Sequence, residues 1–164
     1  PARGTYKAGE FWMYNNWDFN VLLTIFEQET KKDFFETLKE DIADPIQMSD
    51  FLLEDYIRRS GERSIHDSYM FWITASDMAR FGLLFLRNGK WKDKQIIPEE
   101  WMKNSTSLQF DFKGKTKLQI RDGYGYLFWI DKDKNNQVVG FSALGNGGQY
   151  IYVSPKNKTV IFIS

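Results

Sequence analysis

The chain has 164 residues, with 22 Lys plus Arg and 22 Asp plus Glu, so it carries no formal net charge at pH 7. This balance argues against a dedicated binder of nucleic acids or anionic membranes, and no apolar run approaches the roughly 20 residues that a membrane-spanning helix needs. The chain has no Cys and one His, which excludes disulfides, thiol nucleophiles and His-rich metal sites, and we expect no metal and no cofactor.

The N-terminal part of the sequence predicts two helices. Apolar residues recur at steps of three and four within residues 17–26, and Asn15 or Asn16 can cap the helix that they form. A second helix is expected at about residues 33–43, where apolar side chains again share one face. The mixed sequence of residues 49–71 predicts irregular structure.

Two further helices are expected in the middle of the chain. Thr74, followed by Asp77, resembles a capping box ahead of an apolar stripe, and Gly89 suits the C-terminal end of that helix. Pro98 is typical of a helix start and predicts a short helix through Met102.

The last third of the chain predicts strands. Residues 105–122 are polar and rich in Lys, which favours a solvated loop or an exposed hairpin over an anion site. From Gly123 the apolar period is two, and further strands are expected at residues 138–144, 149–153 and 159–163. Helices followed by an antiparallel meander predict an α+β fold.

Two well-known kinds of site are only imitated by the sequence. His66 could serve a Ser-His-Asp triad with Asp67 or Asp77, but no Gly-x-Ser-x-Gly elbow accompanies it, so a structural role is expected. Residues 131–136 resemble the start of a calcium loop but lack the Gly that its sixth position requires. A polar hairpin turn is expected there.

Two short segments could carry chemistry. Tyr14-Asn15-Asn16 is the only Tyr-x-Asn triplet and lies ahead of a predicted helix, so a phenol and an amide can face one cleft. A phenol held near a Lys could lose its proton and act as a base. Residues 145–149 lie between two predicted strands, where missing side chains let a substrate approach backbone N–H groups. Taken alone, a helix cap and a tight turn explain these segments equally well.

Five segments occur in one order along the chain: YNNWDFN at 14–20, ITASDMARFG at 73–82, QIIPEEW at 95–101, GYGY at 123–126 and GNGGQYIYV at 145–153. Together they resemble the serine hydrolases of the β-lactamase and penicillin-binding-protein superfamily. The similarity is greatest to the branch of class C-like esterases, D-amino-acid peptidases and 6-aminohexanoate-dimer hydrolases. It covers nearly the whole chain and implies an incomplete β-lactamase/transpeptidase-like α+β fold. A helical lobe is then expected at about residues 1–107 and antiparallel sheet strands at about 108–164.

The resemblance also implies roles for single residues. In this family the serine of a Ser-x-x-Lys motif attacks an acyl carbon, and the acyl-enzyme that forms is hydrolysed. By this resemblance Tyr14 transfers protons, and Asn16 orients the Lys and the substrate amide. Asn146, Gly147 and Gly148 match the third motif, with a backbone N–H near Asn146 as the oxyanion donor. Many relatives carry Lys or His where Asn146 stands, so a small-molecule ester, small amide or peptide is expected as substrate rather than a β-lactam or D-Ala-D-Ala.

The family nucleophile is missing from the sequence, because no Ser is followed by Lys at the third position. The motif lies upstream of Tyr-x-Asn in the family, and a terminal helix follows the sheet. We therefore expect a C-terminal portion that lacks both and whose open sheet another chain completes.

Two alternatives stay open at the level of sequence. One is a non-catalytic relative that binds peptidoglycan-like peptides or other ligands, and the other is a plain α+β scaffold in which Tyr14 and Gly147 are structural. Relatives are often exported in bacteria, which favours a periplasmic or extracytoplasmic location.

Overall fold

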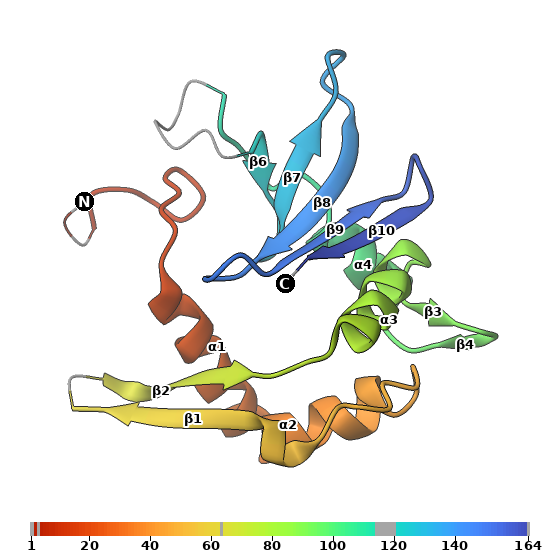
Figure 1. Ribbon diagram of the computed structural model, residues 1–164. Coiled ribbons are helices and arrows are strands. Elements are labelled where there is room, and N and C mark those ends of the chain that lie inside the picture. Colours follow the sequence, from red (N-terminus) through yellow and green to blue (C-terminus); the bar gives the residue numbers. More distant parts are fainter. Residues whose placement is uncertain (1, 3, 63, 114–120, 164) are drawn as a thin grey trace. The chain divides into compact units, whose positions relative to one another are not determined.

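The computed structural model describes residues 2, 4–62, 64–113 and 121–163, and it has the predicted α+β fold (Figure 1). Contacts between residues divide the chain into two units. Unit 1 consists of Pro1–Phe34 and Tyr56–Phe71, and unit 2 consists of Phe35–Asp55 and Trp72–Ser164. Each unit is described by itself below. Among the described helices, none combines the length and the apolar character needed to cross a membrane.

Unit 1 combines one helix with one hairpin. Helix α1 (Asn16–Thr30) packs on strand β2 (Ser64–Phe71), which pairs antiparallel with β1 (Tyr56–Gly61). The helix confirms the prediction for this segment and resolves its cap. The side-chain Oδ1 of Asn15 accepts a 3.1 Å hydrogen bond from the N–H of Trp17, so Asn15 is the cap residue.

The hairpin shows that the irregular structure expected at residues 49–71 is wrong. Beyond Tyr56 and Ile57, which are half-buried, the residues of β1 are exposed and include Arg58 and Arg59. No alternating apolar pattern therefore marks this strand in the sequence. Its stability comes from its partner strand and, through β2, from α1, which are contacts between segments far apart in sequence.

Unit 2 contains the other predicted helices. Helix α2 (Phe34–Leu38) continues into a π-helical turn (Lys39–Ala43), as expected for residues 33–43, and a 3₁₀ turn (Leu53–Asp55) follows. Helix α3 (Ala75–Leu86) begins after Thr74, whose Oγ1 accepts a hydrogen bond from the N–H of Asp77. Helix α4 (Glu99–Ser105) follows Pro98. The predicted caps and starts of α3 and α4 are thus confirmed.

A six-stranded antiparallel sheet forms the rest of unit 2, in the order β10-β9-β8-β7-β6-β5. Its strands are β5 (Phe110–Asp111), β6 (Gly123–Tyr124), β7 (Trp129–Lys132), β8 (Val138–Leu144), β9 (Tyr150–Ser154) and β10 (Thr159–Ile163). The last three confirm the predicted strands. A small hairpin of β3 (Lys90–Trp91) and β4 (Lys94–Gln95), which the sequence did not predict, follows α3.

The expected single strand after Gly123 is wrong, because a turn divides it into β6 and β7. In this turn the N–H of Gly125 donates to the carbonyl of Phe128 at 2.8 Å, and Leu127 has a left-handed φ of 67°. The N–H of Tyr126 donates to the carbonyl of Ser105, which fixes the turn at the end of α4. Upstream, β5 pairs with β6 within the segment expected to be a loop or hairpin; residues 114–120 of that segment lie outside the described residues.

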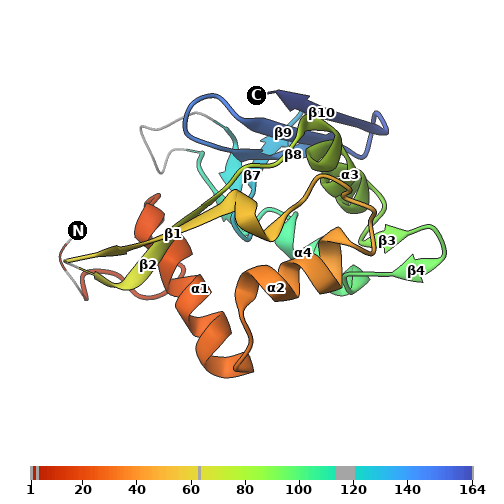
Figure 2. The same ribbon diagram turned by 60° about the horizontal axis from the view of Figure 1, so that its bottom comes forward.

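The sheet has one face covered by α3, and this face carries the core of unit 2. Buried Ile130, Phe141, Ile151 and Val153 pack against apolar side chains of α3 and of β10. Figure 2 shows α3 lying along β9 and β10. The approach is close because Gly82 has no side chain. A Cβ there would lie 2.5 Å from the Val160 Cγ1 atom.

Candidate active site

The predicted Tyr-x-Asn segment lies at the N-terminal end of α1, in unit 1. Tyr14 is 39 % exposed, and its ring centroid lies 6.0 Å from that of Phe19 and 6.4 Å from that of Trp12. Sequence reasoning did not single out Trp12, although the density of aromatic residues around Tyr14 was a usable signal. The phenol is therefore presented within an aromatic surrounding.

Asn16 and Asn15 have different surroundings although they are neighbours. The side chain of Asn15 caps α1 and also donates a 3.3 Å hydrogen bond to the Oδ1 atom of Asp18. Asn16 is the exposed first residue of the helix, and its side chain makes no hydrogen bond to the described residues. Capping thus accounts for Asn15 and leaves Asn16 without a structural task at this position.

The predicted third motif forms the turn between β8 and β9, in unit 2. The N–H of Gly145 donates to the carbonyl of Gln149 at 2.8 Å and closes the hairpin, so Asn146, Gly147 and Gly148 form its exposed tip beyond the strands. Gly147 and Gly148 have φ values of 92° and 100°, which side chains oppose and glycine allows.

The backbone of this tip is accessible. A Cβ at Gly148 would meet no atom within 4 Å. The N–H groups of Asn146, Gly147 and Gly148 donate to no backbone carbonyl among the described residues. They are therefore available to an acceptor such as an oxyanion.

These residues belong to two units. Tyr14 and Asn16 lie in unit 1, and Asn146, Gly147 and Gly148 lie in unit 2. The structure describes the two parts of the predicted site separately, and the assignment of catalytic roles to these residues stays a prediction.

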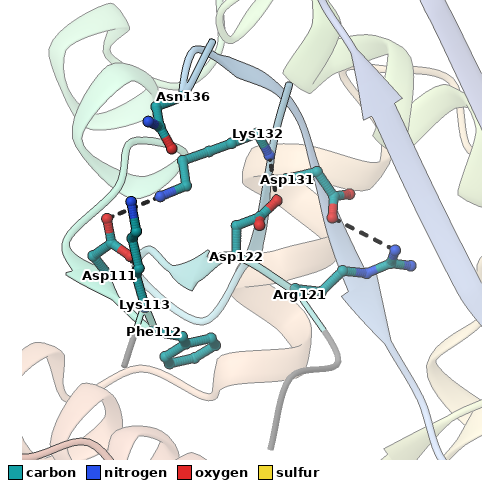
Figure 3. Close-up of a pocket in the computed structure, with 8 residues that line it drawn as sticks. All are labelled: Asp111, Phe112, Lys113, Arg121, Asp122, Asp131, Lys132 and Asn136. Atoms are coloured by element: carbon teal, nitrogen blue, oxygen red, sulfur yellow. Dashed lines mark hydrogen bonds and ion pairs between the residues drawn. The ribbon is translucent and has the colours of Figure 1, made fainter. Parts of the chain in front are cut away.

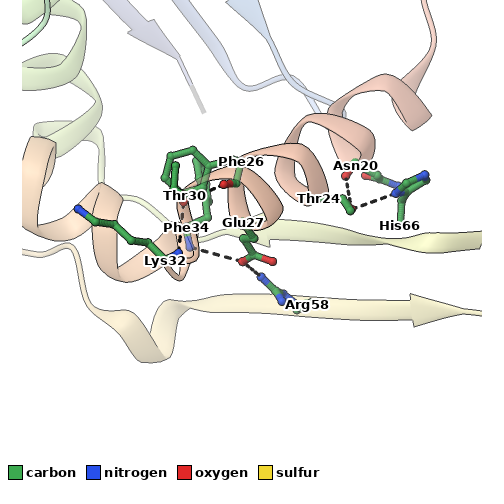
Figure 4. A network of polar contacts seen from close by, with 9 residues as sticks. All are labelled: Asn20, Thr24, Phe26, Glu27, Thr30, Lys32, Phe34, Arg58 and His66. Carbon is green, nitrogen blue, oxygen red and sulfur yellow. Dashed lines mark hydrogen bonds and ion pairs between the residues drawn. The ribbon is translucent and has the colours of Figure 1, made fainter.

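His66 has the surroundings of a packing residue (Figure 4). Its Nδ1 lies 3.0 Å from the Oγ1 of Thr24, which in turn donates to the backbone carbonyl of Asn20. The edge of its ring system meets Trp17 at a centroid distance of 5.0 Å. The candidate triad partner Asp77 belongs to unit 2, where it is fully buried and its carboxylate accepts hydrogen bonds from the Asp50 N–H and from Arg80. His66 thus links β2 to α1, as the sequence led us to expect.

An ion pair joins β1 to α1 in the same part of unit 1. The guanidinium of Arg58 pairs with the carboxylate of Glu27, which also accepts a hydrogen bond from the N–H of Phe34 (Figure 4). The hydrogen bond to Glu27 raises the pKa of Arg58, against the opposing effect of burial. The neighbouring groove of about 360 Å³ is therefore bordered by charges that are already paired.

A polar pocket of about 480 Å³ lies on the sheet of unit 2 (Figure 3). Lys132 pairs with Asp111 at 2.8 Å, and Arg121 pairs with Asp131 at 3.5 Å. Burial raises the pKa of Asp131, while Arg121 lowers it. The charges of this pocket are matched among its own residues. Over the described residues, no group of three or more carboxylates and imidazoles could hold a metal ion.

Two solved structures are similar to the whole of this chain. A protein of Bacillus anthracis, named as a candidate 6-aminohexanoate-dimer hydrolase, superimposes with a TM-score of 0.68 at 26 % identity, over 96 % of this chain and 39 % of that protein. A candidate β-lactamase of Bacteroides dorei DSM 17855 also gives a TM-score of 0.68, at 17 % identity over 97 % of this chain and 52 % of that one, which shows similarity of fold. The chain thus spans about half, or less than half, of these two proteins.

Comparison with curated proteins gives no significant match. A family model named Beta-lactamase matches residues 2–164. That match covers nearly the whole chain and agrees with the α+β fold, with the sheet and α3, and with both similar structures. The chain therefore belongs to the Beta-lactamase family of hydrolases.

Proposed function

We propose that these 164 residues are the C-terminal portion of a serine hydrolase that acts through an acyl-enzyme on esters or small amides. The observation that carries the proposal is the start of α1. There Asn15 takes the capping role, while Asn16 and the 39 % exposed Tyr14 stand beside it in the order of the family motif. Membership of the Beta-lactamase family supports the same reaction class.

In the proposed reaction each group has one task. A serine supplied by a part of the protein outside these residues attacks the acyl carbon, and Tyr14 accepts and returns the proton. The amide of Asn16 orients the substrate. Backbone N–H groups of Asn146, Gly147 or Gly148 donate hydrogen bonds to the oxyanion, and water then releases the acyl group.

The proposed substrate is uncharged at the acyl side. The β8–β9 tip offers Asn146 and two glycines but no cation that could pair with a substrate carboxylate. Tyr14 is flanked by Trp12 and Phe19, which favours an apolar acyl group. A neutral ester such as p-nitrophenyl butyrate is therefore a suitable probe.

The experiment compares the parent protein with two tyrosine variants. Tyr14→Phe should lower kcat for p-nitrophenyl butyrate by about 10²- to 10⁴-fold, because general acid–base catalysis contributes that much. Tyr6→Phe is the control, since Tyr6 lies in the same segment and stacks on Phe11 at 4.7 Å. Equal activity of Tyr14→Phe and the parent, or an equal loss in both variants, would contradict the role of Tyr14.

A second candidate function rests on the missing nucleophile. Because the sequence contains no Ser-x-x-Lys, a relative that binds peptidoglycan-like peptides without cleaving them also fits. The intact mass of the natural protein separates the two. A mass well above 19.4 kDa together with labelling by a fluorophosphonate supports the hydrolase. A mass of 19.4 kDa, no labelling and saturable binding of a muropeptide support the binding protein.

A further inference from the structure

Strand β10 (Thr159–Ile163) forms a free edge of the six-stranded sheet. It pairs with β9 over five consecutive residues without a register shift, and no other described strand lies on its outer side. Helix α3 packs on its inner residues and holds the strand in place. An edge of this kind presents a regular row of N–H and C=O groups to another strand.

The other strand edges carry features that oppose such pairing. At the opposite edge of the sheet, β5 has two residues, one of which is Asp111. In unit 1, β1 carries Arg58 and Arg59 and has a register shift between Arg59 and Gly61. Short length, charge and bulges all discourage association between edges. The sequence TVIFI of β10 contains no charge and no proline, and it has none of these features.

β10 also exposes apolar side chains beside its open edge. Ile161 is 45 % exposed and Ile163 is 55 % exposed. Side chains alternate along a strand, so these two lie on the sheet face opposite to α3, next to their register partners Tyr152 and Tyr150 on β9. A strand added at this edge would bury them together with its own backbone groups.

We propose that β10 pairs antiparallel with the β10 strand of a second copy of this chain, so that two six-stranded sheets become one. The strand is complementary to itself in the register centred on Ile161. In that register Ile161 meets its own counterpart, and Val160 of each copy meets Phe162 of the other. Apolar and β-branched side chains in such cross-strand pairs are stabilising.

The charges near the strand agree with this arrangement. Lys158 directly precedes β10 and is the nearest cation in sequence. In the symmetric register the two copies of Lys158 lie about 20 Å apart, at roughly 3.3 Å per residue. They therefore do not oppose each other. The contact is the same on both copies and closes after two chains, and a five-residue pairing is a small interface. We therefore expect a reversible dimer.

The test is the mass of the 164-residue chain by sedimentation velocity, from micromolar to near-millimolar concentration. The mass should rise from 19.4 kDa toward twice that value. Ile161→Lys places two ammonium groups opposite each other at the centre of the interface and should abolish the rise, with the far-UV circular dichroism unchanged. Val138→Lys is the control, because Val138 is also 45 % exposed but lies on β8, inside the sheet. It should dimerise like the parent.

A second measurement keeps the proposal testable if Ile161→Lys fails to fold. Hydrogen exchange of the parent should show slower exchange of the β10 amides at high than at low concentration, with β8 unchanged. A monomer at every concentration would overturn the proposal, including a monomer whose β10 edge serves another part of a longer protein. Unchanged dimerisation of a folded Ile161→Lys, or equal loss of the dimer in Val138→Lys, would also overturn it.

Discussion

Asn15 and Asn16 show how two identical neighbours divide structural and chemical work. One amide satisfies the start of α1, and the other makes no hydrogen bond to the described residues. The sequence could only state that either residue can cap the helix, because both have the same side chain. Which of them does so depends on backbone angles. Asn15 has the extended φ and ψ of a cap residue, at −147° and 118°.

This division predicts different effects on stability. Asn15→Ala should lower the free energy of unfolding by about 1 kcal/mol, because it removes the acceptor for the Trp17 N–H. Asn16→Ala should change it by less than about 0.5 kcal/mol, as is usual for an exposed side chain. Urea unfolding followed by far-UV circular dichroism measures both. Equal destabilisation by the two variants would show that Asn16 also has a structural role.

At the scale of elements, the contact of α3 with the sheet depends on Gly82. A Cβ at this position would lie 2.5 Å from the Val160 Cγ1 atom and 3.3 Å from the Ile151 Cγ2 atom. Both neighbours are β-branched and can rotate little. The helix therefore approaches β9 and β10 at the minimum distance that the backbone allows.

Gly82→Ala should consequently destabilise the protein, although alanine is the better helix former. Overpacking costs about 1–3 kcal/mol, which exceeds the gain of about 1 kcal/mol in helix propensity. Gly61→Ala is the matched control, because a Cβ at Gly61 meets no atom within 4 Å. Urea unfolding should give a lower midpoint for Gly82→Ala than for Gly61→Ala, and a higher midpoint would show that α3 can shift without cost.

The elements that the sequence predicts well are those whose signals are local. Caps and apolar periodicity mark α1 and α3, and alternation marks β8, β9 and β10. The hairpin of β1 and β2 is missed, because exposed Arg58 and Arg59 hide the strand and distant α1 supports it. The break between β6 and β7 is missed because Leu127 adopts a left-handed conformation that its residue type does not suggest.

The candidate site follows the same rule. The motifs are visible in sequence because they are contiguous, and the structure adds the local facts that Asn15 caps the helix and that Gly147 and Gly148 have positive φ. Their joint geometry depends on contacts between distant parts of a chain. Pattern alone does not reach such contacts, and the roles of Tyr14 and Asn16 await the kinetic test.

At the scale of the whole molecule, apolar burial is unequal between the two units. Among the described residues, Leu23 is the one buried apolar side chain of unit 1, and the remaining buried apolar residues belong to unit 2. Local stability follows the burial of apolar groups. Unit 1 should therefore open more readily than unit 2.

Hydrogen exchange followed by mass spectrometry measures this difference. Amides of α1 (Asn16–Thr30) should exchange faster than those of β8 and β9 under native conditions. Leu23→Ala serves as the sharper test, since it should accelerate exchange in α1 and leave β8 unchanged. Equal protection of both units in the parent chain would show that they unfold together.

The interleaving of the two units has a consequence for synthesis on the ribosome. Unit 1 is closed by Tyr56–Phe71, so α1 leaves the ribosome well before its partner strands. At about 5–20 residues per second, roughly 2–8 s separate the end of α1 from the completion of β2. During that interval Leu23 has no hairpin to cover it, and the nascent helix offers an apolar stripe to whatever holds newly made chains near the exit tunnel.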